Sequence, residues 1–171
     1  MRRLFAGLVE QTFCTEVGLC DPALTSYLSD LLVDFTHVDR LSAIRRFSGQ
    51  KLEHLAALLI ALSDELPEDE TERDRTLYRN IGDFALFWTG VYPEHLRREQ
   101  GSRDVLHDYV DQGKRSYAIV SELVGENERP PGRLFRQLSE EFEYCAYGLG
   151  LVRREWEHTR PPHGAGPDLV Y

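Results

Sequence analysis

The amino-acid sequence predicts an all-α protein that folds as a single-domain bundle of five to six helices. Apolar residues recur at intervals of three and four along nearly the whole chain, which is the spacing of amphipathic helices. The 171 residues fit one domain, and the hydrophobic share of 42% is enough for a core without disulfides or a structural metal. We therefore expect residues 1–158 to form the bundle and residues 159–171, rich in proline and glycine, to form a flexible tail.

Four helical segments are predicted in the first half of the chain. Residues 3–17 have an apolar spacing that favours a helix. Asp21 has the character of an N-cap and is followed by proline, so a helix is predicted over 22–40. A short helical piece over 41–47 ends at a Ser-Gly pair, and regularly spaced leucines predict a further helix over 51–66, which the next proline ends.

Three longer helices are predicted in the second half. The first covers about 72–89 and follows an acidic segment that we interpret as a solvated turn. A brief helical turn over 93–99 leads to a long helix over 103–124. A loop that contains proline and glycine then separates this helix from the last one, over 133–158.

The helix near 76–89 is expected to lie buried at the centre of the bundle. One face is formed by Leu77, Ile81, Phe84 and Trp88 and is widened by Tyr78 and Ala85, and at the C-terminal end Leu86 and Phe87 cover the remaining directions. A helix that is apolar all round is typical of a buried element. Glycine in a helix interior costs about 0.5–1 kcal/mol relative to alanine, so Gly82 here and Gly113 in the long helix indicate a close crossing at these two positions.

Asp83 lies within this apolar segment, and a buried carboxylate needs a partner. The candidates are an arginine from another helix, the hydroxyl of Tyr109 or Tyr117, and backbone N–H groups at a helix start. Three interpretations follow: a hydrogen-bonded aspartate that fixes helix register, a functional carboxylate, or an exposed side chain. We favour the first, which predicts a loss of more than about 1 kcal/mol of stability for Asp83→Ala.

A possible metal-ligand pattern, Asp/Glu-x-x-His, occurs three times, at Asp34/His37, Asp104/His107 and Glu155/His158. Di-iron bundles use such pairs with every ligand facing inward. On a helical wheel, His37 and His158 lie away from the apolar stripes, and only His107 flanks one. We therefore expect surface histidines, with no metal and no cofactor.

The sequence contains no recognisable catalytic motif. Gly-x-Ser-x-Gly, a Walker-type Gly-Lys-Ser/Thr and Gly-x-Gly-x-x-Gly do not occur. Cys14 and Cys20 have no basic cluster nearby that would activate their thiols, and Cys145 lies on an apolar stripe, as core residues do. An odd number of cysteines without Cys-x-x-Cys favours a reducing compartment, so we expect a cytoplasmic protein.

The charge balance limits the classes of partner. A formal net charge of -9, from 29 acidic and 20 basic residues, disfavours nucleic acid and anionic membrane surfaces. The sequence has no segment with the ~20 consecutive apolar residues that a membrane span needs. The classes of partner that remain are another protein and a second copy of the chain, for example in a homodimer.

Three runs of the sequence resemble a group of uncharacterised bacterial helical proteins: IGDFALFWTGVYPEHL, DYVDQGKRSY and LFRQLSEEFEYC. The matching positions are Gly82, Asp83, Leu86, Phe87, Gly90, Pro93 and Glu94 in the first run, Tyr109, Gly113 and Tyr117 in the second, and Leu134, Phe135 and Leu138 in the third. The resemblance covers residues 20–155. It implies a helical fold and brings no activity with it.

Taken together, these features predict a non-catalytic domain that acts in protein–protein interaction or regulation. Two alternatives stay open: a bundle that binds a small apolar ligand or a metal cofactor, and an enzyme that uses Asp83 or His107 as an acid or base. The residues expected to line a ligand site or to be buried polar groups are Asp83, Trp88, Tyr109, Tyr117 and His107.

Overall fold

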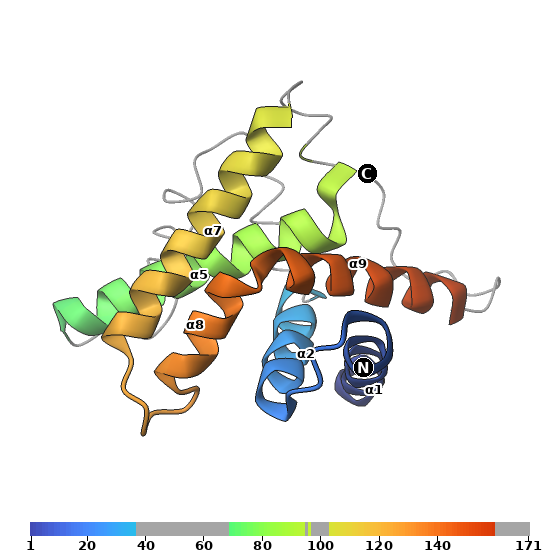
Figure 1. The fold of residues 1–171 in the computed structure, drawn as a ribbon, viewed down its shortest axis with the longest axis horizontal. Helices are drawn as coiled ribbons and strands as arrows, with labels where there is room; N and C mark the ends of the chain where they lie inside the picture. Colours follow the sequence, from blue (N-terminus) through green and yellow to red (C-terminus); the bar gives the residue numbers. More distant parts are fainter. Residues whose placement is uncertain (37–68, 95, 97–102, 160–171) are drawn as a thin grey trace.

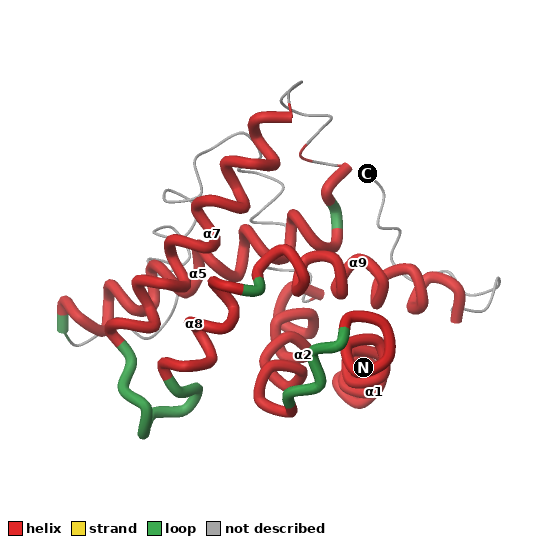
Figure 2. The backbone as a smooth tube through the Cα atoms, viewed as in Figure 1, coloured by secondary structure: helices red, strands yellow, loops and turns green. Residues whose placement is uncertain are grey.

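The computed structural model (Figure 1) describes residues 1–36, 69–94, 96 and 103–159. It confirms the all-α class, since no strand occurs in this part of the chain (Figure 2). The helices are α1 (Arg2–Thr12), the short π-helical segment η1 (Phe13–Val17), α2 (Pro22–Thr36), α5 (Glu70–Val91), α7 (Arg103–Leu123), α8 (Gly132–Glu140) and α9 (Phe142–Thr159). The segments predicted over 41–47 and 51–66, most of the 93–99 turn and nearly all of the 159–171 tail lie outside the described residues.

Helix α5 lies at the centre of the bundle and is buried, as the apolar pattern predicts. α7 packs along it, α9 crosses it near its C-terminal end, and α1 and α2 lie together below α9 in the view of Figure 1. Ile81, Phe84, Leu86 and Phe87 are each at most 3% exposed, although they point in different directions around the helix axis. The core therefore surrounds the C-terminal half of α5.

Two helix boundaries differ from the prediction. The carboxylate of Asp69 accepts a hydrogen bond from the backbone N–H of Glu72 (2.7 Å), so α5 is capped and begins earlier, at Glu70. The single helix predicted over 133–158 is wrong, because the chain leaves helical geometry at Glu141 and forms α8 and α9 instead. This break lets α8 pack against α7 while α9 crosses α5 and α1.

A disulfide bond joins Cys14 to Cys20, contrary to the expectation of a chain without disulfides. It closes the short connection between η1 and α2. Gly18 in this connection has a φ of 80°, a left-handed conformation that favours glycine. Cys145 is buried in the core, as predicted, and this burial raises the pKa of its thiol to about 12.

Two glycines permit the close crossing of α5 and α7, but they do not face each other. A Cβ on Gly82 would lie 2.7 Å from the ring of Tyr117. A Cβ on Gly113 would lie 2.5 Å from the ring of Phe142 and 2.8 Å from the Cβ of Ala85. The predicted contact between Gly82 and Gly113 is therefore wrong. Gly82 makes room for the ring of Tyr117 on α7, and Gly113 makes room for Ala85 on α5 and for the ring of Phe142 on α9.

Arg153 on α9 holds the C-terminal end of α5. Its guanidinium group donates to the carbonyl of Val91 (2.6 Å), pairs with Glu94 and Glu157, and lies 4.4 Å from the ring centroid of Tyr92. The last carbonyls of a helix have no partner within the helix, so a cation placed there is stabilising. The Pro-Glu pair that follows α5 in the sequence therefore supplies the acidic partner of this arginine.

Gly113→Ala is expected to destabilise the protein by about 1–3 kcal/mol, because the new methyl group displaces the Phe142 ring. Gly7→Ala is the matched control, since it also lies within a helix but has no atom within 4 Å of the added Cβ. That change should stabilise by about 0.5–1 kcal/mol. Urea unfolding of both variants measures the difference, and equal shifts would contradict the tight crossing.

Candidate functional site

The most distinctive polar cluster joins three helices around Asp83 on α5. The hydroxyl of Tyr27 on α2 donates to Asp83 Oδ1 at 2.6 Å, and the hydroxyl of Tyr117 on α7 donates to the same atom at 2.7 Å. Arg79 Nε, one turn before the aspartate, donates to the Tyr27 hydroxyl at 3.2 Å and lies 3.9 Å from Asp83 Oδ2. These four side chains are called the Asp83 network below.

The local sequence explains why these side chains meet. Tyr27 belongs to the apolar stripe of α2 and Tyr117 to that of α7, so packing turns both rings inward. A buried tyrosine hydroxyl needs a polar partner, and Asp83 supplies one for both. Because Gly82 has no side chain, the ring of Tyr117 can approach α5 closely enough for its hydroxyl to reach the carboxylate.

Aromatic rings enclose the network. The ring of Phe135 on α8 packs edge-on against Tyr27 at a centroid distance of 5.7 Å. The Arg79 guanidinium lies 5.3 Å from the Tyr27 centroid and 5.8 Å from that of Phe135, within reach of a cation–π contact. The Asp83 side chain keeps only 19% of its surface exposed.

The electrostatics of the network follow from this enclosure. Burial raises the pKa of the Asp83 carboxyl above its ordinary value, Arg79 and the two tyrosine hydrogen bonds oppose that rise, and the charge of Asp34 adds to it. Burial, together with the adjacent carboxylate, also raises the pKa of both tyrosine hydroxyls. Tyr27 and Tyr117 therefore stay protonated and act as hydrogen-bond donors.

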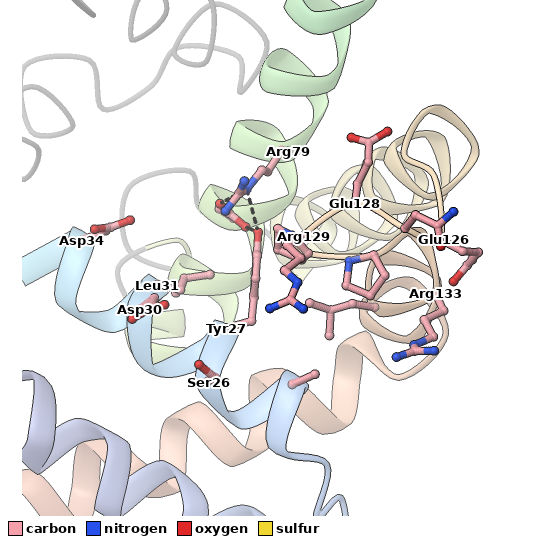
Figure 3. Close-up of a pocket in the computed structure, with 16 residues that line it drawn as sticks. Ser26, Tyr27, Asp30, Leu31, Asp34, Arg79, Glu126, Glu128, Arg129 and Arg133 are labelled. Atoms are coloured by element: carbon pink, nitrogen blue, oxygen red, sulfur yellow. Dashed lines mark hydrogen bonds and ion pairs between the residues drawn. The ribbon is translucent and has the colours of Figure 1, made fainter.

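An open groove adjoins the network. Its main cavity, of about 890 Å³, lies between α2 on one side and the 125–131 loop with the start of α8 on the other (Figure 3). A second cavity of about 280 Å³ continues along α5 toward Arg75. Asp83 and Arg79 line both cavities, so the network forms a floor that they share. We call the two cavities together the α2–α8 groove.

Most charges in the groove are already paired. Asp30 pairs with Arg2 at 2.7 Å, and Glu128 pairs with Arg75 at 2.8 Å. Two exposed arginines differ: Arg129 and Arg133 make no ion pair with any residue in the described ranges. Both come from the edge of the groove that the 125–131 loop and α8 form; in Figure 3, Arg129 extends from this edge toward the middle of the groove and Arg133 lies farther out. These two side chains are available to an anionic group.

The structure brings together only part of the predicted set of site residues. Asp83 and Tyr117 meet in the network, with Tyr117 buried beneath the groove. Trp88 packs with the rings of Phe87 and Tyr92, and the partly buried Tyr109 packs against the core, so neither lines the two cavities. His107 is exposed on α7, with Nε2 at 3.3 Å from an oxygen of Asp111.

Two residues of the network were not predicted from the sequence. Tyr27 lies among the buried apolar residues of α2, and its hydroxyl is the feature of the sequence that indicates a buried polar partner. Arg79 lies one helical turn from Asp83, at the spacing of an ion pair within a single helix. The predicted arginine from another helix is therefore replaced by one from α5 itself.

Neither a metal centre nor a membrane span was found in the part of the chain that the structure describes. Its His, Cys, Asp and Glu side chains form no group of three or more that could hold a metal ion. None of its helices combines the length and the apolar character needed to cross a bilayer. Comparison of the chain with protein-family models, curated proteins and solved structures gave no match.

Asp83→Ala should destabilise the protein by about 3–5 kcal/mol, because it leaves two buried tyrosine hydroxyls and Arg79 without their shared partner. Tyr117→Phe removes one donor to the carboxylate and should cost about 1.5–3 kcal/mol. The two effects should not add in the double variant, since both remove the same hydrogen bond. The network would be contradicted if the losses in unfolding free energy of the two single variants added up in the double variant, or if Asp83→Ala were as stable as the wild type. Tyr144→Phe is the control, because it removes the hydroxyl of an exposed tyrosine and should leave stability unchanged.

The network also predicts a pH dependence. The unfolded Asp83 carboxyl titrates near pH ~3.9, whereas the native pKa is raised, so the native state holds this proton to higher pH. The stability that Asp83 confers is therefore greatest below about pH 4 and falls as pH rises through its native pKa. The side chain at position 83 cannot titrate in Asp83→Asn. The stability of this variant relative to that of the wild type should therefore rise between about pH 4 and the native pKa of Asp83. Urea unfolding between about pH 4 and 8 measures the difference in unfolding free energy between the wild type and Asp83→Asn. A difference that does not change with pH would contradict the raised pKa of Asp83.

Proposed function

We propose that this chain is a non-catalytic helical domain that binds a segment of a partner protein in the α2–α8 groove. The contrast between the floor and the edge of the groove carries the proposal. The floor consists of polar side chains that satisfy one another, whereas Arg129 and Arg133 at the edge have no ion-pair partner within the described ranges. A rigid support beneath unpaired charges suits reversible recognition.

The geometry of Asp83 supports a structural role over an acid–base role. A general base must reach a proton on a bound substrate, but both tyrosine hydroxyls already donate to Asp83 Oδ1, and the Arg79 guanidinium lies 3.9 Å from Oδ2. The lining of the groove also disfavours a small apolar ligand, because charged residues outnumber apolar ones on its walls. Ligand sites for small molecules are mostly lined by apolar and aromatic side chains.

The charges in the groove indicate the chemistry of the partner segment. Arginine binds carboxylates through two parallel hydrogen bonds, so Arg129 and Arg133 favour a segment that presents a carboxylate at this edge. The net charge of -9 and the exposed Glu126 on the same loop oppose a strongly acidic partner. We therefore propose an extended segment with an acidic residue that faces the two arginines and with neutral or basic residues elsewhere.

A peptide-display selection against the immobilised protein tests this proposal. Selected peptides should carry an Asp or Glu at a fixed position and should shift NMR signals of α2, the 125–131 loop and α8. The double variant Arg129→Glu/Arg133→Glu should bind them at least about tenfold more weakly in fluorescence polarisation, because two attractive contacts become repulsive.

Arg136→Glu is the matched control for the double variant. Arg136 is an exposed arginine on α8 that does not line the groove, so the change alters charge without touching the site. Its peptide affinity should equal that of the wild type, and all variants should keep the wild-type unfolding midpoint. Equal weakening by Arg136→Glu, or peptides that bind away from the groove, would contradict the proposal.

We place this function in the cytoplasm, as the odd number of cysteines suggests. The Cys14–Cys20 disulfide is more typical of oxidising compartments and is the observation that opposes this placement. Alkylation of an acid-quenched cell extract under denaturing conditions distinguishes the cytoplasm from an oxidising compartment. A cytoplasmic chain should be labelled at Cys14, Cys20 and Cys145, whereas labelling of Cys145 alone would contradict the proposed compartment.

A further inference from the structure

The two sides of the α2–α8 groove present charges of opposite sign. Asp30 and Asp34 line the α2 side, and because they are four residues apart they lie on one face of that helix. The edge that the 125–131 loop and α8 form presents Arg129 and Arg133 instead. A segment that lies in the groove therefore has carboxylates along one flank and guanidinium groups along the other.

Asp34 and Arg129 lie across the groove from each other where its two cavities meet. Both residues line the main cavity and the second cavity, as do Arg79 and Asp83 of the floor. In Figure 3, Asp34 and Arg129 lie on opposite sides of Arg79. The charge of Asp34 reaches the floor, since it adds to the rise in the pKa of Asp83. Although the structure describes both side chains, Asp34 and Arg129 form no ion pair with each other, so a bound group has room between them.

Other acidic residues of the groove contribute less to this junction. Glu128 also lines both cavities, but it pairs with Arg75 at 2.8 Å. Glu126 lines the main cavity alone, and Glu72 lines the second cavity alone. At the junction itself, a bound segment therefore meets a carboxylate from α2 on one side and a guanidinium group from the loop on the other.

We infer that the partner segment carries a basic residue next to its acidic residue, so that Lys or Arg faces Asp34 while Asp or Glu faces Arg129. This inference rests on the proposed function, the binding of an extended segment in the groove. Successive side chains of an extended chain point to opposite sides. An acidic and a basic residue therefore reach opposite sides of the groove only at an odd spacing, and most directly as neighbours.

The charge of the whole chain favours such a segment over a purely acidic one. An acidic–basic pair has no net charge, so the net charge of -9 does not repel it at long range. Like charges placed face to face are unfavourable, so Asp34 would repel a second acidic residue and Arg129 would repel a second basic one. The groove therefore selects a pair of opposite charges rather than a charge of one sign.

The peptides from the display selection give the first test. Those that bind in the groove should carry Lys or Arg one or three residues from the fixed Asp or Glu. Two fluorescein-labelled versions of one selected peptide give the second test. One version keeps the acidic–basic pair, and the other has Glu in place of the basic residue. The wild type should bind the first version at least about fivefold more tightly in fluorescence polarisation, because the second places a carboxylate opposite Asp34.

Asp34→Lys should reverse this preference. The variant should bind the version with two acidic residues at least about fivefold more tightly than the acidic–basic version. Tight binding of the second version also shows that the variant keeps its fold. Glu122→Lys is the matched control, because it makes the same change in net charge at an exposed residue of α7 that does not line the groove. It should keep the wild-type preference.

Two outcomes would overturn the inference and leave the proposed function in place. In the first, the selected peptides carry the acidic residue without a basic residue at an odd spacing. In the second, Asp34→Lys keeps the wild-type preference. In both, the peptides still bind in the groove and still lose affinity for the Arg129→Glu/Arg133→Glu variant. A selection that yields no peptide bound in the groove would overturn the proposed function and this inference together.

Discussion

The carboxylate of Asp83 accepts hydrogen bonds from two tyrosine hydroxyls, one on α2 and one on α7, and the arrangement of these helices around α5 depends on it. Apolar packing alone tolerates small shifts of one helix along another, because any close contact of hydrocarbon is favourable. An enclosed carboxylate is different, since it is stable only when specific donors reach it. We infer that the network selects one register for α2, α5 and α7.

The same constraint accounts for the glycine at the crossing of α5 and α7. The ring of Tyr117 lies 2.7 Å from where a Cβ at position 82 would stand, so a side chain there would displace the ring and carry its hydroxyl away from Asp83. The helix accepts the unfavourable propensity of Gly82 because the crossing and the hydrogen bond both require it. The adjacent Gly-Asp pair in the sequence is thus one structural unit: the glycine admits the ring and the aspartate binds its hydroxyl.

The sequence was sufficient for features that depend on local periodicity, and insufficient for those that depend on which helices meet. The burial of α5 followed from apolar residues on all its sides, and the start of α2 from Asp21 and proline. The break at Glu141 could not be predicted, because the apolar spacing continues across it and only the separate packing of α8 and α9 requires a bend. The roles of Tyr27 and Arg79 likewise depend on tertiary neighbours.

The division between the floor and the edge of the groove has a consequence for how recognition can change. Substitution on the floor disturbs groups that satisfy one another, and therefore acts on the stability of the fold. Arg129 and Arg133 are exposed and unpaired within the described ranges, so their substitution should alter stability by no more than about 0.5 kcal/mol. Partner choice can therefore vary at the edge while Asp83 continues to hold the helices that support it.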